Sequence, residues 1–413
     1  MSDTLAILVG GGPAPGINGV IASAAIEAIN NGLRVVGIYD GYRALAAGTA
    51  PETIELTIDT VSRIHTSGGS ILRTSRTNPA KDEATLDRCV KSLEALKVRY
   101  LVCIGGDDTT FGATRIAERT QGRIGVATVP KTIDNDLPLP DNAPTFGFET
   151  ARSVGAQIIE SLLEDARTTV RWYIVVSMGR KSGALALGMC KAAGATLAVI
   201  PEEFPEGELD LDLVINTLAG AIIKRRAQGR DHGVAVVAEG IAERLSPSSL
   251  KALESVSKDA YGHVRLADVP LGAVLRDGVR ARLDEFGINA TVLNKDIGYE
   301  LRCAKPVSFD VDYTRTLGYG AVKYLLEGNS GSLIALSGGA VAPVKLADLV
   351  DPATGRIRTR LVDVRTEAYT VARDYMDRLE PEDFEEHQLA ALADLTNLSP
   401  EAFAKRFHRV AFG

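Results

Sequence analysis

Apolar and polar positions follow a regular pattern along this chain, in which short apolar runs alternate with segments of helical periodicity. The first run predicts a strand from Leu5 to Val9, and a glycine-rich turn connects it to a predicted helix from Ile17 to Asn30. A further strand is predicted from Arg34 to Tyr39. Strand, helix and strand in this order are typical of βαβ units, which build parallel sheets.

The same alternation continues on both sides of a loop rich in Pro, Asp and Asn, at residues 130–144. Before the loop, strands are predicted at 100–104 and 124–129; after it, a helix at 148–166 is followed by strands at 172–176, 196–200 and 234–238. Residues 283–299 show no clear pattern. We therefore predict an α/β protein with two similar doubly wound (Rossmann-like) lobes, a cleft between them, and a C-terminal helical extension.

Composition and charge narrow the possible functions. A length of 413 residues suits two lobes, and a net charge of −7 argues against sequence-independent binding of nucleic acid. The four cysteines form no CxxC pair, so they indicate neither a zinc site nor a disulfide framework, and a reducing, cytoplasmic setting is expected. No apolar run approaches the roughly 20 residues of a membrane span, and the N-terminus reads as a strand rather than a signal peptide.

Three loops at predicted strand ends carry residues suited to phosphate chemistry. The glycines of Gly10–Asn18 let backbone amides approach an anion, although a tight turn without a ligand explains this segment equally well. In the loop at 104–112, Asp107 is a suitable Mg²⁺ ligand, and the alternative is a helix cap. In the loop at 130–136, Asp134 can accept a hydroxyl proton and Lys131 can stabilise phosphoryl charge; the alternative is a solvated Asx turn.

Three further segments carry polar groups that suit a sugar phosphate. Arg171 opens a predicted strand, and Arg180 lies in the loop after it, where guanidinium groups can bind phosphate oxygens. Glu239 follows another strand and can hold hydroxyl groups, and Tyr299 and Arg302 lie three residues apart. Surface charges and ordinary turns explain each segment alone. They explain the whole set poorly, because ligands of α/β enzymes gather at successive strand ends.

Taken in order, these motifs resemble the phosphofructokinase family. The matching segments include GGGPAPGIN, GGSILRTSR, IGGDDTTFGA, PKTIDND, SMGRKSG, AEG and GYELR, and they span Gly10 to about Arg302. The resemblance implies a phosphoryl-donor lobe at 1–144, to which residues 304–340 return, a fructose 6-phosphate lobe at 145–303, and an accessory region at 341–413. It also implies a homodimer or homotetramer that uses Mg²⁺.

The resemblance assigns roles to individual residues. Asp134 would be the catalytic base, assisted by Asp136, and Asp107 would carry Mg²⁺. The transferred phosphoryl group and the donor would contact Gly11, Gly12, Arg76, Asp108, Lys131 and Thr132. Fructose 6-phosphate would contact Thr132, Asp134, Arg171, Met178, Gly179, Arg180, Glu239, Tyr299 and Arg302, with Arg171 often serving the site of a neighbouring subunit.

Three positions resemble the pyrophosphate-dependent branch of that family rather than the ATP-dependent branch. Asp108 and Lys131 stand where the ATP branch has glycine, and Pro13 stands where it has aspartate. A carboxylate at 108 would repel the α-phosphate of a nucleotide by a few kcal/mol at about 4 Å. Pyrophosphate ends before that point, and Lys131 can hold its leaving phosphate.

Other functions stay open at this point. An ATP-dependent phosphofructokinase is one alternative, and a non-catalytic subunit that binds sugar phosphates is another. The presence of both Asp134 and Asp136 argues against the second, because a subunit without activity need not keep its catalytic base. A related acceptor such as sedoheptulose 7-phosphate also fits the motifs.

Overall fold

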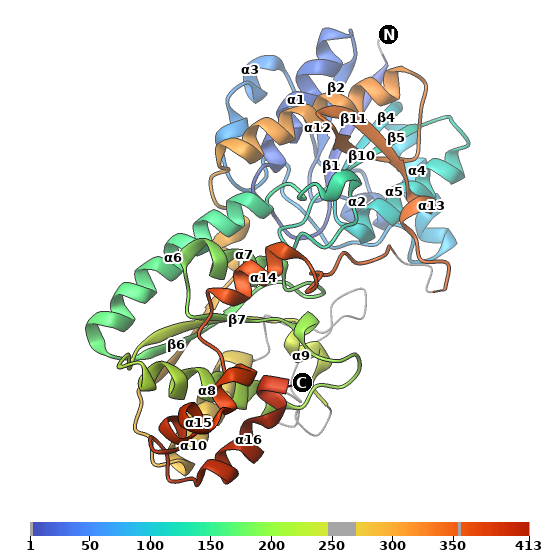
Figure 1. Ribbon diagram of the computed structural model, residues 1–413. Helices are drawn as coiled ribbons and strands as arrows, with labels where there is room; N and C mark the ends of the chain where they lie inside the picture. The colour runs from blue at the N-terminus through green and yellow to red at the C-terminus, as the bar shows by residue number, and fades with distance from the viewer. Residues whose placement is uncertain (1–2, 247–269, 354–356, 413) are drawn as a thin grey trace. The chain divides into compact units, whose positions relative to one another are not determined.

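A computed structural model describes residues 3–246, 270–353 and 357–412 (Figure 1). The chain divides into two compact units, each formed by two separate segments. Unit 1 comprises Met1–Ala151 and Tyr299–Arg360, and unit 2 comprises Arg152–Gly298 and Leu361–Gly413. The expected accessory region at 341–413 is therefore divided, because its first part belongs to unit 1 and the rest to unit 2.

Unit 1 is built on a sheet that has seven strands in the described residues, in the order β11-β10-β5-β4-β1-β2-β3. The five inner strands run parallel, and the two edge strands are antiparallel to their neighbours. The strands are β1 (Thr4–Val9), β2 (Arg34–Ile38), β3 (Thr53–Glu55), β4 (Val98–Gly105), β5 (Gly125–Pro130), β10 (Ser332–Ser337) and β11 (Ala340–Lys345).

Helices cover this sheet, and α1 (Ile17–Asn30) packs against α12 (Ser308–Leu326), as Figure 1 shows. Gly318 of α12 allows this approach, because a Cβ atom there would lie 2.6 Å from the carbonyl oxygen of Val20. The other helices of unit 1 are α2 (Arg43–Ala47), α3 (Ile58–Val61), η1 (Ile64–Thr66), α4 (Glu83–Ala95), α5 (Asp107–Thr120), η2 (Pro140–Asn142), α11 (Tyr299–Arg302) and α13 (Leu346–Leu349).

Unit 2 contains a smaller sheet, which has four parallel strands in the described residues, in the order β7-β8-β6-β9. These strands are β6 (Trp172–Ser177), β7 (Leu197–Val199), β8 (Gly233–Ala238) and β9 (Val292–Ile297). Among the described residues before the C-terminal segment, its helices are α7 (Ala184–Ala193), η3 (Pro201–Glu203), α8 (Leu211–Ala227), α9 (Ile241–Arg244) and α10 (Leu271–Glu285). The long helix α6 (Phe148–Thr169) begins in unit 1 and continues into unit 2.

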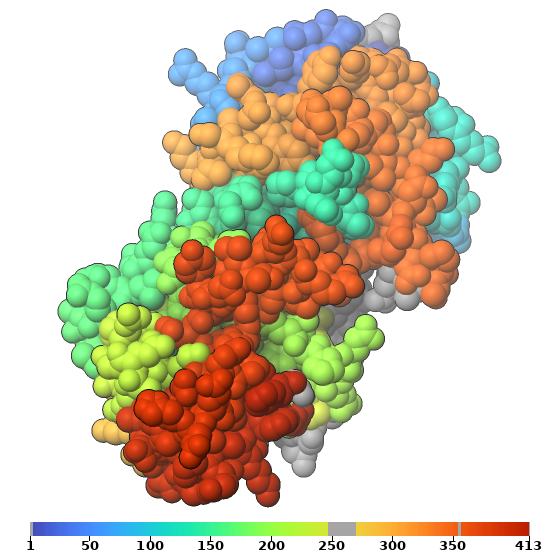
Figure 2. All heavy atoms as spheres, viewed as in Figure 1, coloured from blue at the N-terminus to red at the C-terminus, as the bar shows by residue number. Residues whose placement is uncertain are grey.

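The C-terminal segment packs onto unit 2 and adds to its core. Figure 2 shows this segment in orange-red and red on one face of the unit. It contains α14 (Glu367–Asp374), η6 (Pro381–Phe384), α15 (Glu386–Ala393) and α16 (Pro400–Phe412). Phe407 is fully buried, with its ring centroid 5.7 Å from that of Phe286, so this helical extension is an integral part of unit 2.

The predicted α/β architecture is confirmed, with a parallel sheet in unit 2 and a mixed, mostly parallel sheet in unit 1. The helices at Ile17–Asn30 and Leu211–Ala227 have the predicted bounds. Two helices begin earlier than predicted, α5 at Asp107 rather than Phe111 and α12 at Ser308 rather than Tyr313. Both have acidic residues in the first turn, which the helix dipole favours. In the described part of the chain, no helix is both long and apolar enough to cross a membrane.

Candidate active site

Three neighbouring strands of unit 1 end at the same edge of the sheet, and each leads into a predicted ligand loop. Val9 of β1 pairs with Ile104 of β4, and Gly105 of β4 pairs with Pro130 of β5. The loops that start after these strands therefore lie side by side. The chain continues from β1 to β2 on one side and places β4 on the other, which is the switch point where open α/β sheets bind ligands.

Lys131 connects all three loops. Its side chain is buried, and Nζ donates a hydrogen bond to the Gly12 carbonyl oxygen at 2.5 Å. Its backbone N–H donates to the carbonyl oxygen of Gly105 at 2.9 Å. Gly11 lies close by with a positive φ of 83°, and a Cβ atom there would be 3.3 Å from Nζ of Lys131. The lysine is thus held at the centre of the strand ends by backbone groups.

Charged side chains of unit 1 surround this lysine. Burial lowers the pKa of Lys131 from 10.5 to about 8, and the positive charges of Arg302 and Arg76 lower it as well. The carboxylates of Asp134 and Asp107 act in the opposite direction and raise that pKa. Three cations and two carboxylates therefore act on one another here. A ligand with several negative charges would relieve the repulsion among the cations.

Both arginines approach the glycine loop directly. A Cβ atom at Gly12 would lie 3.7 Å from Nη2 of Arg76 and 3.7 Å from Cζ of Arg302. The Arg302 guanidinium also lies over the exposed ring of Tyr299, 5.3 Å from its centroid. The structure thus places Arg302, which we expected among the sugar-phosphate residues, in the unit that carries the glycine loop.

Asp107 and Asp108 both lie in the first turn of α5, after Gly106 at the N-cap position. The backbone N–H of Asp108 donates to Oδ1 of Asp107 at 2.9 Å. Neither aspartate is the N-cap residue, so the capping interpretation of this pair does not hold. Their position at a helix N-terminus favours the ionised carboxylates.

The loop after β5 has a fixed conformation. The N–H of Asp134 donates to Oγ1 of Thr132 at 3.0 Å, and Oγ1 of Thr145 donates to the carbonyl oxygen of Thr132 at 2.7 Å. Asn135 adopts a positive φ of 56°, which asparagine tolerates better than most residues, and its Oδ1 accepts from the N–H of Thr145 at 3.1 Å. Asp134 and Asp136 are half-buried on either side of Asn135.

Arg360, which sequence reasoning missed, also holds this loop. Its Nε donates to the Asn135 carbonyl oxygen at 3.0 Å, and its Nη1 donates to the Ala143 carbonyl oxygen at 2.8 Å. Its backbone N–H donates to the carbonyl oxygen of Asp136 at 2.7 Å. No motif marks this arginine in the sequence, because it lies 225 positions from Asn135 in a polar stretch without recognisable periodicity.

A second set of predicted residues meets at strand ends in unit 2. Ser177 at the end of β6 pairs with Ala238 of β8 and with Ile297 of β9. Met178 and Glu239 therefore start adjacent loops, and Oε1 of Glu239 accepts a hydrogen bond from the Gly179 N–H at 3.1 Å. Gly179 has a φ of 135°, and a Cβ atom there would meet the Ser182 carbonyl oxygen at 2.7 Å, so this position requires glycine.

The two predicted arginines of unit 2 lie at opposite ends of β6. Arg180 follows its carboxyl end, and its Nε lies 3.7 Å from Oε1 of Glu243. Arg171 precedes the strand, and its Nε lies 3.8 Å from Oδ2 of Asp165. Six strand residues separate the two arginines by roughly 20 Å, so Arg171 does not join Met178, Gly179, Arg180 and Glu239 within one chain.

Comparisons with known proteins show the family to which this chain is related. The sequence model of a family described as Phosphofructokinase matches residues 4–325. A protein of Thermotoga maritima named pyrophosphate--fructose 6-phosphate 1-phosphotransferase is 53% identical, with 98% of both chains covered. A protein of Naegleria fowleri with the same name is 49% identical, with 98% of this chain and 95% of that protein covered.

More distant similarities include both donor types. A protein of Brevibacillus brevis named ATP-dependent 6-phosphofructokinase is 30% identical over 82% of this chain and 91% of its own length. A crystal structure from Nitrosospira multiformis, titled as a pyrophosphate-dependent phosphofructokinase, has a TM-score of 0.68 with 91% of both chains covered. Its sequence identity is 17%, so this last similarity concerns the fold alone.

Proposed function

Because this chain belongs to the phosphofructokinase family, we propose that it transfers a phosphoryl group from pyrophosphate to the 1-hydroxyl group of fructose 6-phosphate. The observation that carries this proposal is the buried Lys131, which lies among Arg76, Arg302, Asp107 and Asp134 at three adjoining strand ends. Such a cluster suits a small, highly charged donor that ends close to the lysine. The products are fructose 1,6-bisphosphate and phosphate, and the reaction would serve glycolysis and gluconeogenesis.

The proposed reaction is an in-line displacement at one phosphorus atom of pyrophosphate. The 1-hydroxyl oxygen forms the new P–O bond while the bond to the bridging oxygen breaks, and the released phosphate keeps that oxygen and its electron pair. The hydroxyl proton passes to the carboxylate of Asp134, which Asp136 assists. The donor is a simple phosphoanhydride and the released product is inorganic phosphate, so no nucleotide is consumed. We therefore expect the reaction to run in both directions. A strongly one-way reaction in a coupled assay would contradict this expectation.

The chain's own groups hold the donor in this scheme. Lys131, Arg76 and Arg302 donate charge-assisted hydrogen bonds to phosphate oxygens. The backbone amides of Gly11 and Gly12, together with the Thr132 hydroxyl, contact the transferred group. Arg302, which the resemblance assigns to the 6-phosphate of the sugar, would in addition contact the donor, since it lies beside Gly12.

Sugar recognition is assigned to the residues of unit 2 and to one exposed tyrosine. Met178, Gly179, Arg180 and Glu239 would contact fructose 6-phosphate, together with Tyr299. Arg171 would contribute to the site of a neighbouring subunit, since β6 separates it from the other unit 2 residues. This role requires a homodimer or homotetramer. Sedoheptulose 7-phosphate is an acceptor that the same groups could bind.

A divalent metal suits the carboxylates of this site. The described residues contain no group of three or more His, Cys, Asp or Glu side chains placed to hold a metal ion. This fits Mg²⁺, which takes one or two carboxylates and completes its shell with water and phosphate oxygens, and Asp107 would be the protein ligand. When bound, Mg²⁺ would offset negative charge on the phosphates.

Selection of the donor rests on Asp108 and Lys131. The carboxylate of Asp108 would fill the space that the α-phosphate of a nucleotide needs and would repel that phosphate. The buried ammonium group of Lys131 would instead attract the terminal phosphate of pyrophosphate. With purified chain and saturating fructose 6-phosphate, kcat/KM for pyrophosphate should exceed that for ATP by about 100-fold or more. The reverse preference would identify an ATP-dependent enzyme. Inactivity with both donors would favour a non-catalytic subunit.

The use of pyrophosphate should depend on pH through Lys131. Its pKa is lowered to about 8, mainly by burial, so the free enzyme loses this positive charge as the pH rises through 8. The value of kcat/KM for pyrophosphate should therefore fall about tenfold per pH unit above that point. The measurement is a profile from pH 6.5 to 9.5. In Lys131→Arg this alkaline decline should disappear, and an unchanged profile in that variant would exclude Lys131 as its origin.

Arg360 should act as a positioning residue for the loop that carries Asp134. Arg360→Met removes the hydrogen bonds to Asn135 and Ala143, and a displaced loop should lower kcat by about 10- to 100-fold with little change in KM. The control is Arg358→Met, because Arg358 is exposed and binds the Asp348 carbonyl oxygen instead. Partial recovery in Arg360→Lys would support positioning, whereas equal kcat values for the Arg360→Met and Arg358→Met variants would contradict it.

A further inference from the structure

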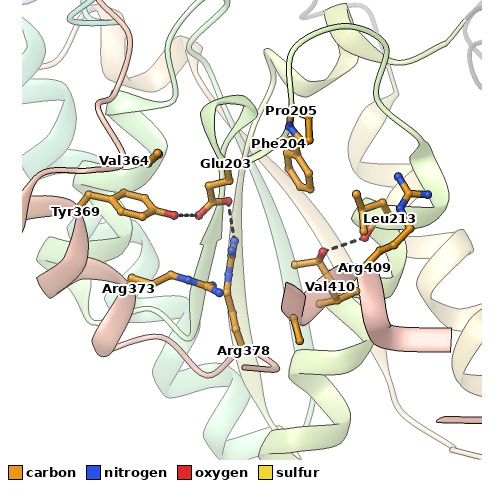
Figure 3. A pocket seen from close by; sticks show the side chains of 12 residues that line it. Glu203, Phe204, Pro205, Leu213, Val364, Tyr369, Arg373, Arg378, Arg409 and Val410 are labelled. Atoms are coloured by element: carbon orange, nitrogen blue, oxygen red, sulfur yellow. Dashed lines mark hydrogen bonds and ion pairs between the residues drawn. The ribbon is translucent and has the colours of Figure 1, made fainter. Parts of the chain in front are cut away.

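The C-terminal segment closes a cavity in unit 2 that none of the proposed catalytic and binding residues lines. It has a volume of about 290 Å³ and lies among η3, α8, α14 and α16 (Figure 3). Phe204, Leu213 and Val410 form apolar parts of its wall, while Arg373 and Arg378 provide guanidinium groups. Cavities of this size and mixed lining can hold small organic molecules.

Arg378 and Glu203 are deeply buried charged groups at this cavity, each with a side-chain exposure of 7%. Arg378 is the cation of this pair. Its Nη2 donates to Oε2 of Glu203 at 2.8 Å and also to the carbonyl oxygen of Ala198. Its Nε, by contrast, is buried and has no hydrogen-bond partner. A buried donor without a partner is destabilising, and more so when the group is charged, so an acceptor there would be strongly favoured.

A second guanidinium group is unsatisfied in the same way. Arg373 forms an ion pair with Glu380, with 2.8 Å between Nη2 and Oε1, while its Nη1 is buried without a partner. Figure 3 shows the guanidinium group of Arg373 directed toward the side chain of Arg378. Burial and the neighbouring charge of Arg378 both lower the pKa of Arg373, as expected for two cations brought together.

The carboxylate of Glu203 does not satisfy these donors. Its Oε1 accepts from the Tyr369 hydroxyl at 2.5 Å, and its Oε2 accepts from Arg378 and from the Ile200 N–H at 3.1 Å. Each of the three arginines of the lining has a carboxylate partner: Arg378 pairs with Glu203, Arg373 with Glu380, and Arg409 with Asp210. The argument for an anionic ligand therefore rests on the two N–H groups that these carboxylates leave without an acceptor.

We propose that this cavity is a binding site for a small organic oxyanion, a carboxylate or phosphate, whose charged end meets the unpartnered N–H groups of Arg373 and Arg378 and whose apolar part lies against Phe204, Leu213 and Val410. The C-terminal segment then has a specific role, since it supplies both arginines. The site is separate from the proposed chemistry, because its residues are not those of the donor loops or of the Met178–Arg180 loop.

Calorimetric titration of the full chain tests this site with two probes, inorganic phosphate and isobutyrate, which distinguish the two oxyanion sources. The key variant is Arg373→Gln, and its matched control is Arg365→Gln, an arginine of the same segment that is 86% exposed. For at least one probe, the wild-type protein and the control should each show one more binding site per chain than the Arg373→Gln variant. Phosphate binding at the proposed catalytic site should be equal in all three proteins.

A second variant keeps the test informative if loss of Arg373 disturbs folding. Val410→Trp fills the cavity and leaves both arginines in place, and it should abolish the same additional site while the unfolding midpoint stays within a few degrees of the wild type. The proposal is overturned if wild type, Arg373→Gln and Val410→Trp bind equal numbers of both probes. It is also overturned if the wild-type protein binds neither probe outside the catalytic site, which would mean that water alone satisfies the two arginines.

Discussion

Replacing Asp134 by Asn should lower kcat by about 10²- to 10⁴-fold, the range expected when a general base is removed. Asparagine keeps the shape of the side chain but cannot accept the hydroxyl proton of the sugar. The loop should keep its conformation, since Asp134 donates to Thr132 through its backbone N–H rather than its side chain. Substrate binding should therefore change far less than the rate.

Steady-state kinetics with both substrates checks this expectation, with Asp59→Asn as the matched control. Asp59 is an exposed aspartate of unit 1 in the first turn of α3, away from the strand ends that carry the loops. If kcat of Asp134→Asn stays within threefold of the control, another group must accept the proton. A similar loss of kcat in Asp136→Asn would show that the second carboxylate contributes to the same step.

Changing both donor-selecting positions should reverse the preference for pyrophosphate. In Asp108→Gly combined with Lys131→Gly, kcat/KM for pyrophosphate should fall by about 10³-fold, because a buried charged contact is worth several kcal/mol. Measurable ATP use should appear at the same time, since the carboxylate that opposes an α-phosphate is gone. The effect combines the loss of an attraction with the removal of a repulsion.

The two single variants separate these contributions. Asp108→Gly alone should admit ATP and leave most pyrophosphate activity, whereas Lys131→Gly alone should lose pyrophosphate activity without gaining ATP. Each protein is assayed with both donors at equal fructose 6-phosphate concentration. A double variant that keeps the original donor preference would show that neither Asp108 nor Lys131 selects the donor.

Much of unit 1 could be predicted because its signals are local. Each donor loop directly follows an apolar run, so Gly11, Asp107 and Lys131 could be expected at one sheet edge before the strand order was known. The edge strand β9 could not be recognised, because four of its six residues are at least partly exposed and it lacks a continuous apolar run. Residues 283–299 gave no clear pattern for this reason.

Residues that act across long sequence distances were beyond prediction. Arg360 reaches Asn135 only because the chain returns to unit 1 after residue 298, and neither position reveals this contact by spacing. The return also explains why Arg302 lies beside Gly12, almost 300 positions earlier in the sequence. Arg373 and Arg378 likewise line a common cavity only because the C-terminal segment packs over η3 and α8.

The burial of Lys131 has an evolutionary consequence. A buried ammonium group opposes the stability of the fold, so many neutral replacements at this position would stabilise the protein while inactivating it. Selection for a stable fold therefore favours a neutral residue at position 131, whereas selection for catalysis favours lysine. In lineages that no longer need the reaction, Lys131 should be replaced early.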